Sequence, residues 1–158
     1  MQIHDKYNLM QTLLSAAKDS QNEECALSVG IIHTSVPDKC CEILDYCLVD
    51  VVGGARRRYS LTIPKEMSYA LISLCQKTGQ VPIIIHTHPK CLNDIPVNFS
   101  PQDIKFINRF VEIASAHSNI KYCLFIVTDG IGIEYCLFDT LNMTYRYERG
   151  LLNESYKF

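Results

Sequence analysis

The sequence predicts a single domain of the mixed α/β class, with helices packed on a central sheet. Two observations support this class. Short β-branched and apolar runs alternate with segments of helical periodicity, and turn residues separate them. The length of 158 residues suits one domain with a hydrophobic core, and the content of 47% hydrophobic and 20% charged residues is ordinary for a folded protein.

The first half of the chain is expected to form two helices with strands between them. Apolar residues at helical spacing predict a helix from about Lys6 to Lys18. Pro64 favours the start of a second helix, which should end near Gly79. Between these helices, β-branched and apolar runs bounded by turn residues predict the strands Cys25–His33, Ile43–Val52 and Tyr59–Ile63.

The second half begins with Val81–Ile85, a continuous apolar run typical of a strand buried on both faces. A helix is expected from Ser100, with serine at the N-cap, Pro101 at the first helical position and Asp103 in the first turn, and it should continue to about His117. An antiparallel meander should follow, formed by Tyr122–Val127, Ile131–Phe138 and Met143–Tyr147.

Composition excludes several classes of function. The formal net charge of −2 provides no basic field for a nucleic-acid backbone. No apolar stretch approaches the roughly 20 residues that span a bilayer, and the N-terminus lacks a signal-peptide core, so a cytoplasmic protein is expected. The eight cysteines include no C-x-x-C pair and are expected to stay reduced as small core residues, so neither a cysteine-built metal site nor a cysteine nucleophile is favoured.

Two histidines stand one residue apart where the central strand is expected to end. Residues i and i+2 of an extended chain point to the same face, so His86 and His88 can direct their imidazoles to one point. This arrangement suits a tetrahedral zinc ion, which favours imidazole nitrogen. The pair alone is weak evidence, because partly exposed polar residues at a strand end give the same pattern.

Asp103 supplies a third candidate ligand from the first turn of the following helix. It can close an ordinary capping box with Ser100, or it can turn outward to bind a cation. A catalytic zinc takes three protein ligands and keeps one position open for water, and His86, His88 and Asp103 supply that number. A carboxylate from a separate strand could then act as a general base.

These segments together resemble the JAB/MPN domain family, the JAMM-motif metallopeptidases. The family pattern is an upstream glutamate, then H-x-H-P, a loop and S-x-x-D. The chain carries Glu23, His86-Thr87-His88-Pro89 and Ser100-Pro101-Gln102-Asp103 in that order. The segment from Glu23 to Gly30 also matches the family's helix-to-strand junction, E-x-x-(G/A)-x-x-x-G, with Glu24 as the alternative glutamate.

The resemblance implies a cytidine-deaminase-like fold and one Zn²⁺ per chain, held by His86, His88 and Asp103. It further implies that Glu23 is the general base and that Ser100 helps to hold the attacking water or the developing oxyanion. The implied activity is (iso)peptide cleavage after the C-terminus of a ubiquitin-like protein, which deconjugates it from targets or matures its precursor. The tail of that protein would bind extended beside a strand.

Several points stay open within this resemblance. The loop between Pro89 and Ser100 has ten residues, more than the common eukaryotic pattern, and Asp94 in it is a less favoured substitute ligand. The small size resembles stand-alone bacterial JAB peptidases that accompany E1- and E2-like enzymes in CBASS and related anti-phage operons. The alternatives are a non-catalytic MPN scaffold, and a sulfur-carrier-processing enzyme or small-molecule metal hydrolase with the same centre.

Overall fold

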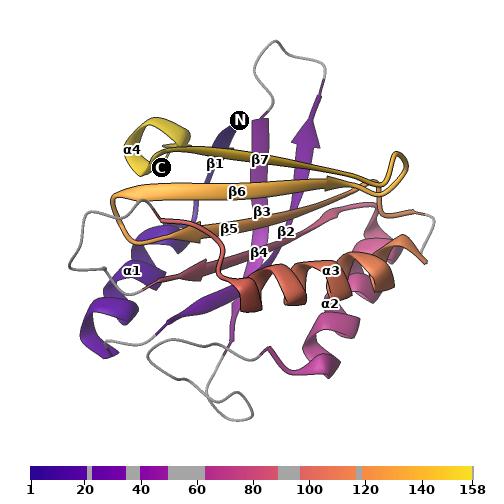
Figure 1. The fold of residues 1–158 in the computed structure, drawn as a ribbon, viewed down its shortest axis with the longest axis horizontal. Coiled ribbons are helices and arrows are strands. Elements are labelled where there is room, and N and C mark those ends of the chain that lie inside the picture. The colour runs from indigo at the N-terminus through magenta and orange to yellow at the C-terminus, as the bar shows by residue number, and fades with distance from the viewer. Residues whose placement is uncertain (21–22, 35–39, 50–62, 89–96, 117–118, 158) are drawn as a thin grey trace.

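The structure is a computed structural model, and it describes residues 1–20, 23–34, 40–49, 63–88, 97–116 and 119–157. Its strands belong to one curled sheet flanked by helices, so the mixed α/β class is confirmed (Figure 1). The strands are β1 (Gln2–His4), β2 (Cys25–His33), β3 (Cys40–Leu48), β4 (Val81–Thr87), β5 (Tyr122–Thr128), β6 (Gly132–Asp139), β7 (Thr144–Leu151) and β8 (Tyr156–Lys157). Their order across the sheet is β7-β6-β5-β4-β2-β3-β1-β8.

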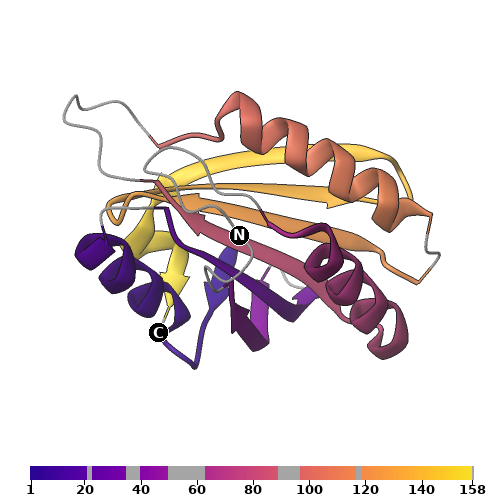
Figure 2. The same cartoon turned by 90° about the horizontal axis from the view of Figure 1, so that it is seen from below.

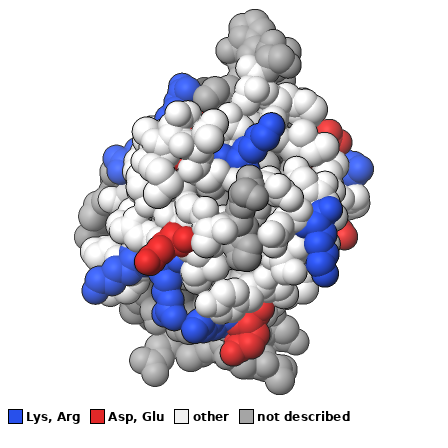
Figure 3. Space-filling model, turned by 90° about the vertical axis from the view of Figure 1, so that its right-hand side faces the viewer, with Lys and Arg blue, Asp and Glu red and all other residues white. Residues whose placement is uncertain are grey.

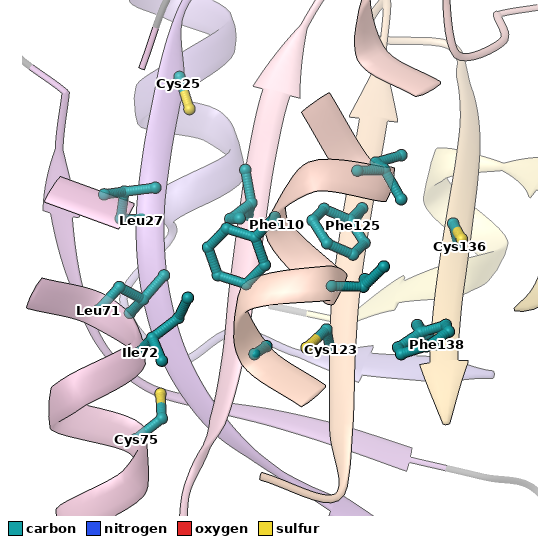
Figure 4. Packing of buried hydrophobic residues seen from close by; sticks show 14 of the residues in the cluster. Cys25, Leu27, Leu71, Ile72, Cys75, Phe110, Cys123, Phe125, Cys136 and Phe138 are labelled. Atoms are coloured by element: carbon teal, nitrogen blue, oxygen red, sulfur yellow. The ribbon is translucent and has the colours of Figure 1, made fainter. Parts of the chain in front are cut away.

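The helices divide the molecule into two cores, one on each face of the sheet (Figure 2). Buried residues of α2 and α3, including Leu71 and Phe110, pack on one face, which we call the α2–α3 face (Figure 4). Leu9 and Met10 of α1 pack on the opposite face. The helices are α1 (Leu9–Ser20), α2 (Lys65–Thr78), α3 (Pro101–Ser115) and the short α4 (Leu152–Ser155).

Strand β4 lies near the middle of the sheet and is buried along its whole length, as its apolar sequence predicted. It pairs antiparallel with β2 and parallel with β5. Among the described residues, four of the seven neighbouring strand pairs are antiparallel, so the sheet is mostly antiparallel. β4 continues to Thr87, two residues beyond the predicted end, and therefore includes His86.

The boundaries of other elements differ from the sequence prediction for local reasons. α1 begins at Leu9 rather than near Lys6, because the Asp5 carboxylate accepts the backbone N–H groups of Tyr7 and Met10 and holds a turn there. β3 begins three residues earlier than predicted, because its first residues pair with β1. The predicted strand Tyr59–Ile63 lies almost wholly outside the described residues.

One glycine of the upstream motif is required by a close backbone approach. β2 and β3 change register between Val29 and Gly30, and a Cβ at Gly30 would stand 2.4 Å from the backbone oxygen of Glu42. A side chain at this position would collide with the neighbouring strand. Gly79 has a different role, since it caps α2 at φ 72°, the left-handed conformation that glycine adopts without strain.

The surface and the helices give two further findings. Among the described residues, no helix is long and apolar enough to cross a membrane. Figure 3 shows lysine and arginine side chains dispersed around one face, with acidic side chains among them. Its described atoms therefore form no continuous basic field of the kind that binds a phosphate backbone.

Candidate metal centre

The two histidines of the H-x-H segment converge at the end of β4. Ile84 belongs to the core on the α2–α3 face, and because side chains alternate along a strand, His86 and His88 point to that same side. Their Nε2 atoms lie 3.2 Å apart. The His86 ring is almost completely buried, whereas the His88 side chain is 19% exposed. The His86 imidazole is therefore buried against the core, whereas part of the His88 imidazole is accessible to solvent.

Asp103 reaches the same point from the first turn of α3. Its Oδ1 lies 3.3 Å from His86 Nε2, and its Oδ2 lies 3.2 Å from His88 Nε2. The capping box is also present, because the Ser100 N–H donates to Asp103 Oδ2 at 2.7 Å and the Asp103 N–H donates to Ser100 Oγ at 3.2 Å. The carboxylate thus caps the helix and faces both imidazoles at once, so the two roles are compatible.

The spacing of these atoms fits a tetrahedral metal ion. With ligand bonds of about 2.0 Å, two ligand atoms of a tetrahedral zinc are separated by about 3.3 Å. The 3.2 Å between the two Nε2 atoms matches that edge length, and each imidazole lies 3.2–3.3 Å from one oxygen of the Asp103 carboxylate, Oδ1 for His86 and Oδ2 for His88. His86, His88 and Asp103 could therefore hold a metal ion, and three protein ligands would leave a fourth position for a small molecule.

The charge distribution also favours a cation at this point. Burial tends to raise the pKa of Asp103, but hydrogen bonds from His86 and His88, the charge of His86 and a hydrogen bond from Ser100 outweigh it, and the pKa lies well below its usual range. The carboxylate therefore remains ionised near neutral pH, as a metal ligand must be.

Glu23 and Glu24 stand beside this cluster, just before β2. Cys25, the first residue of β2, pairs with His86, and beyond this pair Thr87 donates its N–H to the Glu24 carbonyl oxygen at 2.9 Å. Both glutamates are buried, with relative exposures of 6% and 4%. Burial raises the pKa of the Cys25 thiol, and the negative charges of Asp103, Glu23 and Glu24 raise it further, so all three carboxylates act electrostatically on Cys25.

The alternation of side chains along the chain assigns Glu23 and Glu24 to opposite faces of the sheet. Cys25 belongs to the core on the α2–α3 face and Ala26 to the core on the opposite face. If the alternation continues backward, the side chain of Glu23 lies on the side of the histidines and that of Glu24 on the other side. The backbone of Glu24 is also held by Thr87, whose Oγ1 accepts its N–H at 2.9 Å.

A further buried carboxylate, that of Glu134, was not predicted from the sequence, and it holds the segment that leads into α3. Glu134 of β6 accepts the backbone N–H of Phe99 at 2.6 Å and the Nε–H of Arg149 at 2.7 Å. Phe99 directly precedes Ser100, and its ring centroid lies 6.2 Å from that of His86. Glu134 therefore fixes the segment that places Asp103. Its signal in the sequence is a charged residue within the apolar run Ile131–Phe138.

Two further contacts shape the surroundings of the cluster. Val97 packs closely over Gly132, where a Cβ would stand 2.9 Å from the valine side chain. A cavity of about 50 Å³ lies between α3 and the sheet, and it is lined by His86 and Asp103 and mainly by apolar residues, among them Ile84, Phe99 and Phe106. Pro89 and Asp94, which the sequence analysis singled out, lie outside the described residues.

At this level the fold and the site define a class: a mixed α/β protein whose central strand and neighbouring helix bring together a His-His-Asp cluster able to hold a metal ion. No protein-family model matches the chain, and no curated protein matches it. A more particular assignment therefore depends on the sequence motif and on the geometry of the cluster.

Proposed function

We propose that the protein is a zinc-dependent (iso)peptidase of the JAB/MPN type that cleaves after the C-terminus of a ubiquitin-like protein. The observation that carries this proposal is the convergence of His86, His88 and Asp103, whose ligand atoms lie within 4.8 Å of one another, with the buried Glu23 just before the adjacent strand β2. Each of these residues belongs to the JAMM-like sequence motif, and His88 and Asp103, 15 residues apart in the chain, come together in the cluster.

Each residue has a defined task in this proposal. His86, His88 and Asp103 hold the zinc, which when bound supplies a Lewis acid that polarises a carbonyl group and makes water acidic enough to react near neutral pH. Glu23 accepts a proton from the attacking water and returns it to the leaving amine. The hydroxyl of Ser100 accepts the Asp103 N–H, and in this proposal it assists in holding the attacking water or the oxyanion.

The burial of the residues around the cluster supports a hydrolytic role. Burial of His86 and Glu23 lowers the local dielectric constant, which strengthens interactions with developing charge. The His88 side chain is 19% exposed, so a substrate would approach the centre from this side. The choice of a ubiquitin-like protein as substrate, and of E1- and E2-like enzymes as partners in an antiviral operon, rests on the resemblance of the motif alone.

The proposal is tested with zinc-loaded protein and a panel of ubiquitin-like proteins fused through their C-terminal glycine to a reporter. The wild type should release the reporter, whereas Glu23→Gln should bind zinc normally and lose at least about 10²-fold in rate, because a general base is worth that much. Glu24→Gln is the matched control and should retain activity. A zinc-loaded wild type inactive on every fusion would favour the scaffold, and cleavage only of small acyl or amide compounds would favour the small-molecule hydrolase.

A further inference from the structure

The outermost strand β7 presents a long, regular edge to solvent. β7 pairs with β6 over its full length, from Thr144 to Leu151, without a change of register. Its other side meets no strand among the described residues, because β7 is the terminal strand in the sheet order (Figure 1). Its residues are exposed apart from the half-buried Glu148.

Such an edge is unusual in a protein that remains alone. Natural sheets interrupt exposed edges with proline, a bulge or a very short strand, since an open row of N–H and C=O groups recruits another strand. β7 has eight residues, no proline and no bulge. Exposed apolar side chains line it at both ends and in the middle: Met143 at 61%, Tyr147 at 44% and Leu151 at 47%.

We propose that β7 pairs antiparallel with β7 of a second copy of this chain, around a two-fold axis at Tyr147. In this register Arg146 lies opposite Glu148 of the second copy, and Tyr145 lies opposite Arg149 of the second copy. Leu151, the last residue of β7, lies near Met143 of the second copy, which belongs to the turn that precedes the strand. The two copies thus join opposite charges, place a cation beside an aromatic ring and cover exposed apolar side chains.

Charge selects this register over its neighbours. A two-fold axis normal to the sheet must pass through one residue of β7. At Arg146 it would set two arginines directly opposite, and at Glu148 it would set two glutamates directly opposite, and like charges in direct opposition destabilise a strand pair. With the axis at Tyr147, no directly opposed pair carries like charges. The sequence Arg-Tyr-Glu is therefore complementary to itself only when the tyrosine is central.

The side chains are already arranged for this contact. Arg146 Nε lies 2.5 Å from Glu148 Oε1 in the same strand, and Arg146 is 60% exposed. Glu148 Oε2 also lies 3.2 Å from the Met1 ammonium, so the second copy would add opposite charges to a cluster that is already ordered. The rings of Tyr145 and Tyr147 stack with centroids 6.3 Å apart. Tyr147 also contacts Phe99, and the Tyr145 hydroxyl donates to Asn108 of α3, so both rings are held in place before the second copy binds.

Disulfide trapping tests the register directly. The parent protein for this experiment has both Cys47, which is exposed, and Cys91 replaced by serine. Directly opposite residues have Cα atoms about 4.5–5.5 Å apart, within disulfide range, so Tyr147→Cys should form a covalent dimer under mild oxidation. Tyr145→Cys is the matched control. The two copies of residue 145 would be four residues out of register, about 14 Å apart, and should stay monomeric under the same conditions. Equal trapping at both positions would overturn the proposal.

Charge reversal tests it without cysteine chemistry, using sedimentation equilibrium. Arg146→Glu and Glu148→Arg each create two like-charge pairs and should raise the dimer dissociation constant by about tenfold or more. An equimolar mixture of the two variants restores both opposite-charge pairs and should form a heterodimer. Lys77→Glu on α2 is the control for net charge and should leave the dimer unchanged. A wild type that is monomeric at about 100 µM, or variants that do not complement each other, would refute self-pairing and leave the edge to a different protein.

Discussion

Replacement of Glu134 should reveal how firmly the buried carboxylate holds the segment that enters α3. Glu134→Ala removes the acceptor of the Phe99 N–H, and an unsatisfied buried N–H costs about 1–3 kcal/mol. Loss of the contact with Arg149 adds about 1 kcal/mol at most, because that arginine is 57% exposed and can be hydrated. The free energy of unfolding should therefore fall by about 1–4 kcal/mol, a decrease of about 2–16 °C in Tm for a domain of this size.

The assay is urea denaturation of metal-free protein, followed by circular dichroism. Glu134→Gln provides an internal comparison, because its amide oxygen can still accept the Phe99 N–H while the charge is lost, and it should lose less than the alanine variant. Glu112→Ala, on the exposed side of α3, should change the free energy of unfolding by less than about 0.5 kcal/mol. If Glu134→Ala is as stable as Glu112→Ala, the carboxylate does not hold Phe99 as described.

Two other predictions follow from the packing and from the buried thiols. Gly30→Ala should lower the free energy of unfolding by at least about 2 kcal/mol in thermal denaturation, because its Cβ would stand 2.4 Å from the Glu42 oxygen, whereas Gly79→Asn at the open helix cap should lose far less. Burial raises the pKa of Cys75 to about 12 and is the main cause that raises the pKa of Cys136 to about 11, from 9.0. The unfolded chain therefore releases protons that the native chain keeps, and the free energy of unfolding in reductant should fall as pH rises from 9 toward 11; a value that rises or stays constant over that interval contradicts the burial of these thiols.

The sequence could predict the candidate site because each part of it obeys a local rule. Alternation along a strand places His86 and His88 on one side, and the helix-start pattern at Ser100 places Asp103 in the first turn. Neither rule predicts that the start of α3 lies beside the end of β4. That placement depends on distant contacts, chiefly Glu134 with Phe99, which no local spacing reveals.

Much of the fold was predictable for the same reason, and the missed elements are those without local periodicity. β1 and β8 have three and two residues, too few to show an alternating pattern, and they exist through pairing with each other and with β3. The extension of β7 to Leu151 was also missed, because its polar and exposed residues carry no apolar signal and its pairing with β6 alone fixes them.

The central claim is that His86, His88 and Asp103 form one metal site, and elemental analysis of zinc tests it most directly. Wild type, Asp103→Ala and Ser100→Ala are purified side by side and exposed to the same zinc solution. Ser100→Ala is the control for loss of the helix cap, since it removes the serine hydroxyl of the capping box and keeps the carboxylate. We predict about one zinc per chain in the wild type and in Ser100→Ala, and a sharp loss in Asp103→Ala. A folded wild type that takes up no zinc, or an Asp103→Ala variant that keeps it, would contradict the account.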